Sequence, residues 1–117
     1  MADKTLEMVL LFDFFGELLT EKQREYFDLY YNEDLSLSEI AEISGISRQG
    51  VRDMLKRAEN SLVEFEKKTG VVMRFTDIQR RISELQSVAQ RLEEISIDDE
   101  SKKLSEMLVK GLQELKG

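Results

Sequence analysis

Residues 37–55 read LSEIAEISGISRQGVRDML, and this stretch decides the fold. Its residue types follow the order that two short helices joined by a tight turn require. Ala41 is small enough to let the helices cross closely, and Gly45 can adopt the positive φ of the turn. Four apolar residues are spaced to hold both helices on a core: Ile40, Ile46, Val51 and Met54. The stretch therefore predicts a helix-turn-helix motif.

Residues suited to start helices stand before both helices of the motif. Ser36 is followed three residues later by Glu39, the spacing of a capping box, in which each side chain binds a backbone N–H at the helix start. Ser47 is placed to cap the second helix. Thr20 and Gln23 repeat the capping-box spacing upstream and predict another helix. In the first motif helix, the residues expected to face inward are Leu37, Ile40, Ala41 and Ile43.

The second motif helix carries the residues that could bind nucleic acid. Arg48, Arg52 and Lys56 are four residues apart, so they form one stripe, which we expect on the face opposite the apolar one. Arginine and glutamine early in such a helix suit base edges, whereas later lysine and arginine suit phosphates. A serine cap can also hold a phosphate at the positive helix end. The candidate nucleic-acid-binding residues are Ser47, Arg48, Gln49, Arg52, Lys56 and Arg57.

Two residues of the same helix argue against nucleic-acid binding. Asp53 would repel a phosphate if it faced the groove of the nucleic acid. Gly50 would cost on the order of 1 kcal/mol relative to alanine in a helix interior. Charge stripes are also often only solvated surfaces. A helical hairpin that never touches nucleic acid therefore stays open as the alternative.

Apolar residues at spacings of three and four extend the helical prediction along the chain. A first helix is expected over 4–19, and the second motif helix is expected to reach about residue 67. Thr69 and Gly70 mark a boundary, after which two more helices predict an antiparallel hairpin, the second capped by Asp98 or Asp99. We thus predict an all-α chain with a helix-turn-helix domain at 1–70. The hairpin at 71–117 packs on its own domain or forms a homodimer.

Composition excludes several classes of function. The chain has 117 residues with no cysteine and no histidine, so disulfides, thiolate metal sites and nucleophile–histidine pairs are absent. The only tight carboxylate cluster stands at a helix start, where acidic residues are favourable: Asp98, Asp99 and Glu100. No apolar run approaches the roughly 20 residues that span a bilayer. We expect a cytoplasmic protein that is not an enzyme, uses no cofactor or metal and does not insert into membranes.

Charge is distributed unevenly along the chain. The net charge of −7 opposes non-specific binding to nucleic acid when averaged over the surface. Residues 1–35 hold three basic and nine acidic residues, and 76–117 hold seven basic and nine acidic ones. Residues 36–75, which contain the motif, hold seven basic and six acidic residues. The motif therefore lies in the one segment that is not acidic.

Two resemblances sharpen the prediction. Residues 19–62 resemble the C-terminal promoter-reading domain of bacterial sigma factors, with Leu19-Thr20, Arg24 and Ser47-Arg48 at matching places. The whole chain resembles the YlxM family of small helix-turn-helix proteins. The segments LLFDFFGELLTEKQREYFDLYYNEDLSLSEIAE (10–42) and ISRQGVRDMLKR (46–57) carry this resemblance. In that family the gene typically lies beside those of the signal recognition particle GTPases, which implies a regulatory or accessory role in that pathway.

These observations lead to one expected function and two alternatives. The leading prediction is a DNA-binding regulator of transcription whose second motif helix enters a major groove, acting as a dimer. The first alternative is an accessory factor that binds signal recognition particle RNA through phosphates and shape, because a helix cannot read the deep, narrow major groove of A-form RNA. The second alternative is a module that binds only proteins, including those of the signal recognition particle.

Overall fold

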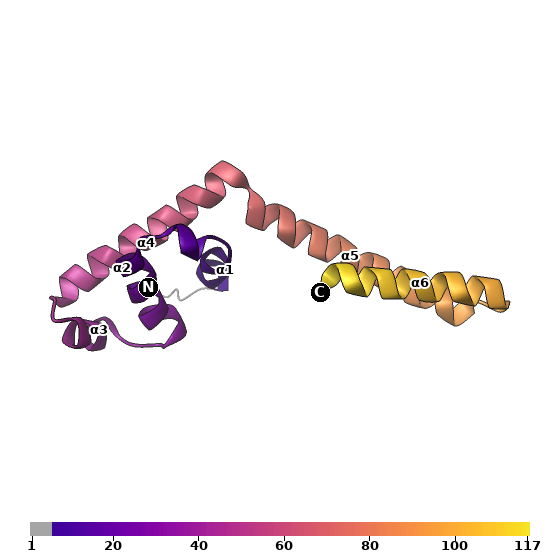
Figure 1. Cartoon of the computed structure of the whole chain (residues 1–117), viewed down its shortest axis with the longest axis horizontal. Helices are drawn as coiled ribbons and strands as arrows, with labels where there is room; N and C mark the ends of the chain where they lie inside the picture. Colours follow the sequence, from indigo (N-terminus) through magenta and orange to yellow (C-terminus); the bar gives the residue numbers. More distant parts are fainter. Residues whose placement is uncertain (1–5) are drawn as a thin grey trace. The chain divides into compact units, whose positions relative to one another are not determined.

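The chain is all-α in the computed structural model, which describes residues 6–117 (Figure 1). The described part contains no strand. Its elements in chain order are α1 (Leu6–Phe15), a 3₁₀ turn η1 (Gly16–Leu18), α2 (Glu21–Phe27), a π-helical turn η2 (Asp28–Asn32), α3 (Leu37–Ser44), α4 (Arg48–Thr69), α5 (Val71–Ile95) and α6 (Asp99–Lys116). The predicted all-α class is confirmed. Residues 4 and 5 of the first predicted helix lie outside the described residues.

The chain divides into two compact units, Met1–Val72 and Met73–Gly117. The first unit contains the helix-turn-helix, formed by α3 and α4, together with α1 and α2. The second contains the hairpin of α5 and α6. Each unit has its own pattern of buried and exposed apolar residues. This pattern determines which surface of the unit is exposed and available for binding.

The predicted caps are present at the helix starts of the first unit. Thr20 Oγ1 accepts a hydrogen bond from the Gln23 amide at 3.1 Å, and the Gln23 side chain accepts one from the Thr20 amide at 3.2 Å. Ser36 and Glu39 form the same reciprocal pair before α3. Ser47 Oγ accepts a hydrogen bond from the Gly50 amide at 3.0 Å. Because these contacts join residues three apart, the sequence alone could predict them.

Two apolar clusters hold the first unit together. The larger one joins α1, α2, η2 and α4, with Phe27 between the rings of Phe12 and Tyr31 at centroid distances of 4.5 and 4.2 Å. The smaller one lies under the motif and contains Tyr26, Ile40, Val51 and Leu55. Ile40 and Val51 are fully buried, and Met54 packs against the same cluster. This smaller cluster fixes α3 across α4 and so fixes which flank of α4 is exposed.

Two of the residues expected to face inward do not. Ile43 is 67% exposed and Ile46 is 40% exposed. The helix α3 has only eight residues and packs on α4 and η2, so Ile43 near its end has no neighbouring helix to cover it. Ile46 precedes the cap of α4 and lies over Gly50, where an added Cβ would stand 3.5 Å from Ile46 Cδ1. Its side chain covers the first turn of α4 and stays outside the core.

The first helix is shorter than predicted. It ends at Phe15, and the chain continues as the 3₁₀ turn over Gly16–Leu18. Gly16 is buried, and a Cβ there would lie 3.1 Å from the Phe12 ring. The ring of Phe12 thus occupies the space that a side chain at this position would need.

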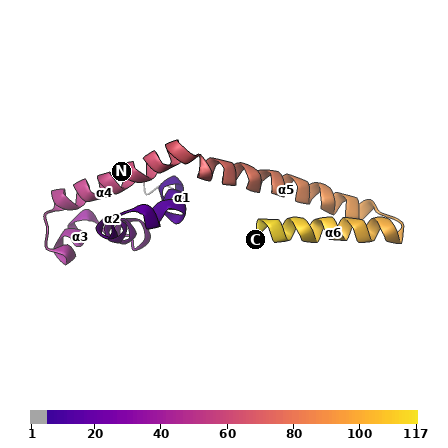
Figure 2. The same ribbon diagram turned by 45° about the horizontal axis from the view of Figure 1, so that its top comes forward.

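The second unit is an antiparallel hairpin (Figure 2). Asp98 caps α6 by accepting a hydrogen bond from the Ser101 amide at 3.0 Å, as predicted. Gln86 on α5 donates to Gln113 on α6 at 3.0 Å, and Lys116 Nζ donates to Ser83 Oγ at 2.9 Å. Three residues are buried between the helices: Ile82, Ala89 and Ser105. The predicted C-terminal hairpin is confirmed.

Candidate nucleic-acid interface

The buried side of α4 determines which of its residues are available for binding. Four residues at steps of four, three and four are buried against the clusters of the first unit: Val51, Leu55, Ala58 and Leu62. Because an α-helix advances about 100° per residue, Arg48, Arg52 and Lys56 lie about 60 to 140° around the axis from Val51. They therefore occupy one flank of α4, beside the start of α3, and not the face directly opposite the core.

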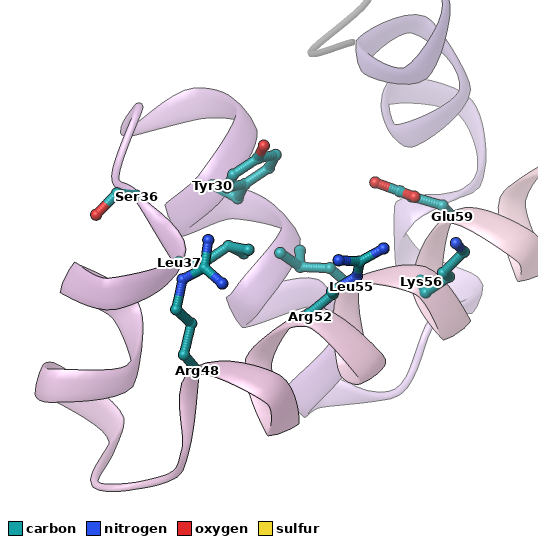
Figure 3. A pocket seen from close by; sticks show the side chains of 8 residues that line it. All are labelled: Tyr30, Ser36, Leu37, Arg48, Arg52, Leu55, Lys56 and Glu59. Carbon is teal, nitrogen blue, oxygen red and sulfur yellow. The ribbon is translucent and has the colours of Figure 1, made fainter. Parts of the chain in front are cut away.

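This flank is one wall of a groove (Figure 3). Arg48, Arg52 and Lys56 line it from α4, and residues around the start of α3 line it from the other side. The groove has a volume of about 570 Å³. Its remaining lining residues are Tyr30, Ser36, Leu37, Leu55 and Glu59. Three of the six predicted binding residues are thus brought together in one concave site.

The cations of this flank have no carboxylate partner among the residues that the structure describes. Arg48, Arg52 and Lys56 form no hydrogen bond or ion pair with any of them, and all three side chains are exposed. In the hairpin, by contrast, Arg80 pairs with Asp77 and Glu84. A cation without a partner keeps its full attraction for an external anion. The flank of α4 therefore has the electrostatic character of a phosphate-binding surface.

One carboxylate also lines the groove, and it has a partner. Glu59 accepts a hydrogen bond from the hydroxyl of Tyr31, a buried residue of the larger cluster. This bond holds the carboxylate in place beside the core. With three cations and one carboxylate, the lining of the groove has a net positive charge.

The other predicted residues lie around the groove and not inside it. Gln49 is on the outward face of α4, where its side-chain amide donates to Asp53 at 3.0 Å. Ser47 uses its hydroxyl to cap α4. Arg57 is exposed, about 120° around the axis from Val51 on the opposite flank. It forms no ion pair with any described residue.

Sequence reasoning missed the far wall of the groove. Ser36 was identified only as a helix cap, and Tyr30 and Leu37 only by their helical periodicity. These residues come within one site because the smaller cluster sets α3 across α4. The spacing of residues along one helix does not predict which residues of another element will lie beside it. The capping serine at the start of α3 was the one local clue that this helix end would be exposed.

Other kinds of site find no support in the described part of the chain. Over residues 6–117, no group of three or more histidine, cysteine, aspartate or glutamate residues is placed to hold a metal ion. Among the same residues, no helix has the length and apolar character that crossing a membrane requires.

Comparison with known proteins places the chain in a family. Residues 2–110 match the family described as "Putative helix-turn-helix protein, YlxM / p13 like". A UPF0122 protein of Thermoanaerobacter sp. (strain X514) is 46% identical over 115 residues, which cover 98% of both chains. A UPF0122 protein of Bacillus cereus (strain AH187) is 44% identical over 110 residues, covering 94% of this chain and 98% of the relative. The chain therefore belongs to the UPF0122 family of YlxM/p13-like helix-turn-helix proteins.

Proposed function

We propose that this chain is a DNA-binding regulatory protein of the helix-turn-helix class. The observation that carries the proposal is the flank of α4, where Arg48, Arg52 and Lys56 line one groove without carboxylate partners among the described residues. Membership of a helix-turn-helix family supports it. The resemblance to sigma-factor promoter-reading domains supports DNA as the nucleic acid.

In this proposal the first three turns of α4 enter the major groove of the DNA. Arg48, Gln49 and Arg52 contact base edges, since arginine pairs with guanine and glutamine with adenine in bidentate geometry. Lys56 and Arg57 on the two flanks hold phosphates of the opposite strands, and Ser47 holds the helix end that points at the DNA backbone. The protein acts by binding in the cytoplasm, with no catalytic step.

The alternative is an accessory factor of the signal recognition particle that binds its RNA or its proteins and has no role in transcription. One observation favours backbone contact over base reading: Gln49 is bound to Asp53 at the outward face of α4. If that pair persists in the complex, the base-reading amide is occupied, and the cations alone bind through phosphates. Under this alternative, affinity depends on charge and shape but little on Gln49.

A binding experiment separates the two proposals. Labelled genomic DNA fragments and signal recognition particle RNA are each titrated with the wild type and with Arg48→Ala/Arg52→Ala at two salt concentrations. We expect the wild type to enrich specific DNA fragments and the double variant to bind them more weakly by about 30-fold or more, because each of the two base-contacting arginines contributes about 1–3 kcal/mol. Gln49→Ala is expected to change which fragments are enriched.

A matched control separates specific contacts from a general loss of charge. Arg80→Ala/Arg91→Ala removes two exposed arginines from the outer side of α5, so the net charge changes by the same amount. This variant is expected to bind as the wild type does. RNA binding that depends on Arg48 and Arg52, without DNA enrichment, would establish the accessory factor. Absence of binding to both nucleic acids at low salt would contradict the DNA-binding regulator and the RNA-binding form of the alternative, and would leave a fold used for protein contacts.

A further inference from the structure

The hairpin exposes a row of large apolar residues along α5. They recur at steps of seven, three, four and three, which places them on one side of the helix. Their exposed fractions run from 41 to 65%, and they are Ile78, Leu85, Val88, Leu92 and Ile95. The buried residues of α5, Ile82 and Ala89, face α6 from the neighbouring sector of the helix. The exposed row is therefore separate from the packing that holds the hairpin together.

A second row lies along α6, on the same side of the hairpin. Leu104, Leu108 and Leu115 are 50 to 69% exposed and are spaced by four and seven residues. The bonds between Gln86 and Gln113, and between Ser83 and Lys116, mark the polar edge of the contact between the helices. In an antiparallel pair of helices, these polar residues lie on one side of the contact, and both apolar rows lie on the other side. The hairpin thus has one polar side and one side, here called the apolar face, made of the eight residues named above.

The size of the apolar face matches a protein interface. Eight such residues, each about half exposed, present on the order of 800 Å² per copy, and a pair of copies would bury about 1,600 Å², the usual total for a stable interface. Monomeric soluble proteins rarely expose contiguous apolar patches of more than a few hundred Å². A face of this size is typical of an interaction site.

The charges at the two ends of the hairpin indicate which partner. The loop end is acidic, because residues 93–100 contain five carboxylates and no cation: Glu93, Glu94, Asp98, Asp99 and Glu100. The open end has an excess of one cation, with Arg74, Arg80, Arg81 and Lys116 against Asp77, Glu84 and Glu114. A second hairpin can pack on the apolar face in the reversed direction, with its loop end beside the open end of the first hairpin. Each acidic end then lies against a basic end, and a two-fold axis relates the two copies.

We propose that the apolar face binds a second copy of this chain, so that two hairpins form an antiparallel four-helix bundle. In this bundle α5 packs against α5 of the second copy and α6 against α6, and every neighbouring pair of helices is antiparallel. The two-fold axis passes near Val88, at the middle of the face. The proposal needs no nucleic acid, so it stands or falls separately from the proposed function.

Sedimentation equilibrium of the full chain tests the proposal. The wild type is expected to be a dimer at micromolar concentration, and Leu85→Gln/Leu92→Gln to dissociate about a hundredfold more readily or more, because two apolar contacts in the centre of the face are lost. Both side chains are exposed in the single chain, so circular dichroism is expected to show an unchanged helix content. Leu6→Gln/Leu18→Gln is the matched control, since these leucines are 84 and 65% exposed in the other unit. A monomeric wild type, or dissociation caused by the control, would overturn the proposal.

Disulfide crosslinking tests the antiparallel arrangement. The chain has no cysteine, so a single introduced cysteine can pair only with itself in a second copy. Val88→Cys is expected to form a disulfide-linked dimer on oxidation, because the two copies of this position lie near the axis. Ile78→Cys is expected to form none, because its two copies lie about 30 Å apart along the helices, far beyond the reach of a disulfide. Crosslinking at Ile78 or its absence at Val88 would contradict the antiparallel bundle.

Discussion

Gly45 ends α3 in the left-handed region, with φ at 72°, and its amide donates to the carbonyl of Ala41. No heavy atom would contact a Cβ at this position, so a substitution meets backbone strain and no steric clash. We expect Gly45→Ala to lower the free energy of unfolding by about 1 kcal/mol, and Gly45→Asn to lower it less, because asparagine adopts this conformation more easily. Urea unfolding followed by tyrosine fluorescence measures both. Equal losses for the two variants would contradict the conformational explanation.

The residues that sequence predicted correctly are those whose partners are close in the chain. The caps at Thr20, Ser36 and Ser47 depend on contacts over three residues, and all three are confirmed. Burial was predicted less well, since Ile43 and Ile46 are exposed. Whether an apolar residue is covered depends on the neighbouring helix, and a periodic pattern does not reveal where that neighbour ends. The role of the candidate binding residues stays a prediction, although the stripe of Arg48, Arg52 and Lys56 was visible from their spacing.

A close contact joins α1 to the 3₁₀ turn η1 that follows it. The Phe12 ring would stand 3.1 Å from a Cβ at Gly16, and it cannot easily move because it stacks on Phe27 at 4.5 Å. We expect Gly16→Ala to lower the free energy of unfolding by about 1–3 kcal/mol through overpacking. In a Phe12→Leu background the loss from Gly16→Ala should shrink, because the smaller side chain leaves space for the methyl group. If Gly16→Ala lowers the free energy of unfolding equally with Phe12 in place and in the Phe12→Leu background, the backbone of η1 and not the ring disfavours alanine.

The start of α6 is sensitive to pH through its cap. Hydrogen bonds from the amide and hydroxyl of Ser101 hold the pKa of Asp98 below its usual range. A carboxyl whose pKa is lower in the folded chain stabilises the fold above its unfolded pKa, and this contribution is lost as the pH falls through the folded pKa. The cap should therefore weaken below about pH 4.

Substitution of the cap isolates this effect from the other carboxylates of the chain. Asp98→Asn keeps an oxygen acceptor for the Ser101 amide but cannot titrate. Urea unfolding at several pH values is expected to show the wild type losing more stability than the variant between pH 5 and about pH 3. Parallel pH profiles for the two proteins would contradict a role for the Asp98 charge.

Helix boundaries were predictable where a cap or a glycine marks them, as at Ser47 and Asp98. They were not predictable where packing sets them. The α1 helix stops at Phe15, beside the contact between Gly16 and the Phe12 ring, and α2 continues as the π-helical turn over Asp28–Asn32, where Tyr31 enters the larger cluster. Both departures lie beside the aromatic stack of Phe12, Phe27 and Tyr31. This stack joins residues from three elements, and no local pattern encodes it.

The protein as a whole combines a net charge of −7 with one flank of cations that have no carboxylate partner among the described residues. The acidic residues outside the motif repel nucleic acid, so the proposed binding would depend on correct placement of α4. The predicted division of the chain into domains at residue 70 stays a prediction, and the two compact units meet at 72 and 73. Each unit has a distinct surface, a cationic flank on one and an apolar face on the other. Because the two surfaces lie on different units, the proposed nucleic-acid binding and the proposed pairing of two copies can be tested with separate variants.

The salt dependence of DNA binding connects the two surfaces. If two copies bind one DNA, each contributes the cations of its own α4, and each phosphate contact adds about 0.9 to the slope of log affinity against log salt. Two phosphate contacts per copy, from Lys56 and Arg57, give a slope of about −3.6 for the dimer and half that for a single copy. Fluorescence anisotropy at four salt concentrations should therefore show the slope of Leu85→Gln/Leu92→Gln to be about half that of the wild type. Equal slopes would mean that one copy of α4 contacts the DNA at a time, whatever the oligomeric state of the protein.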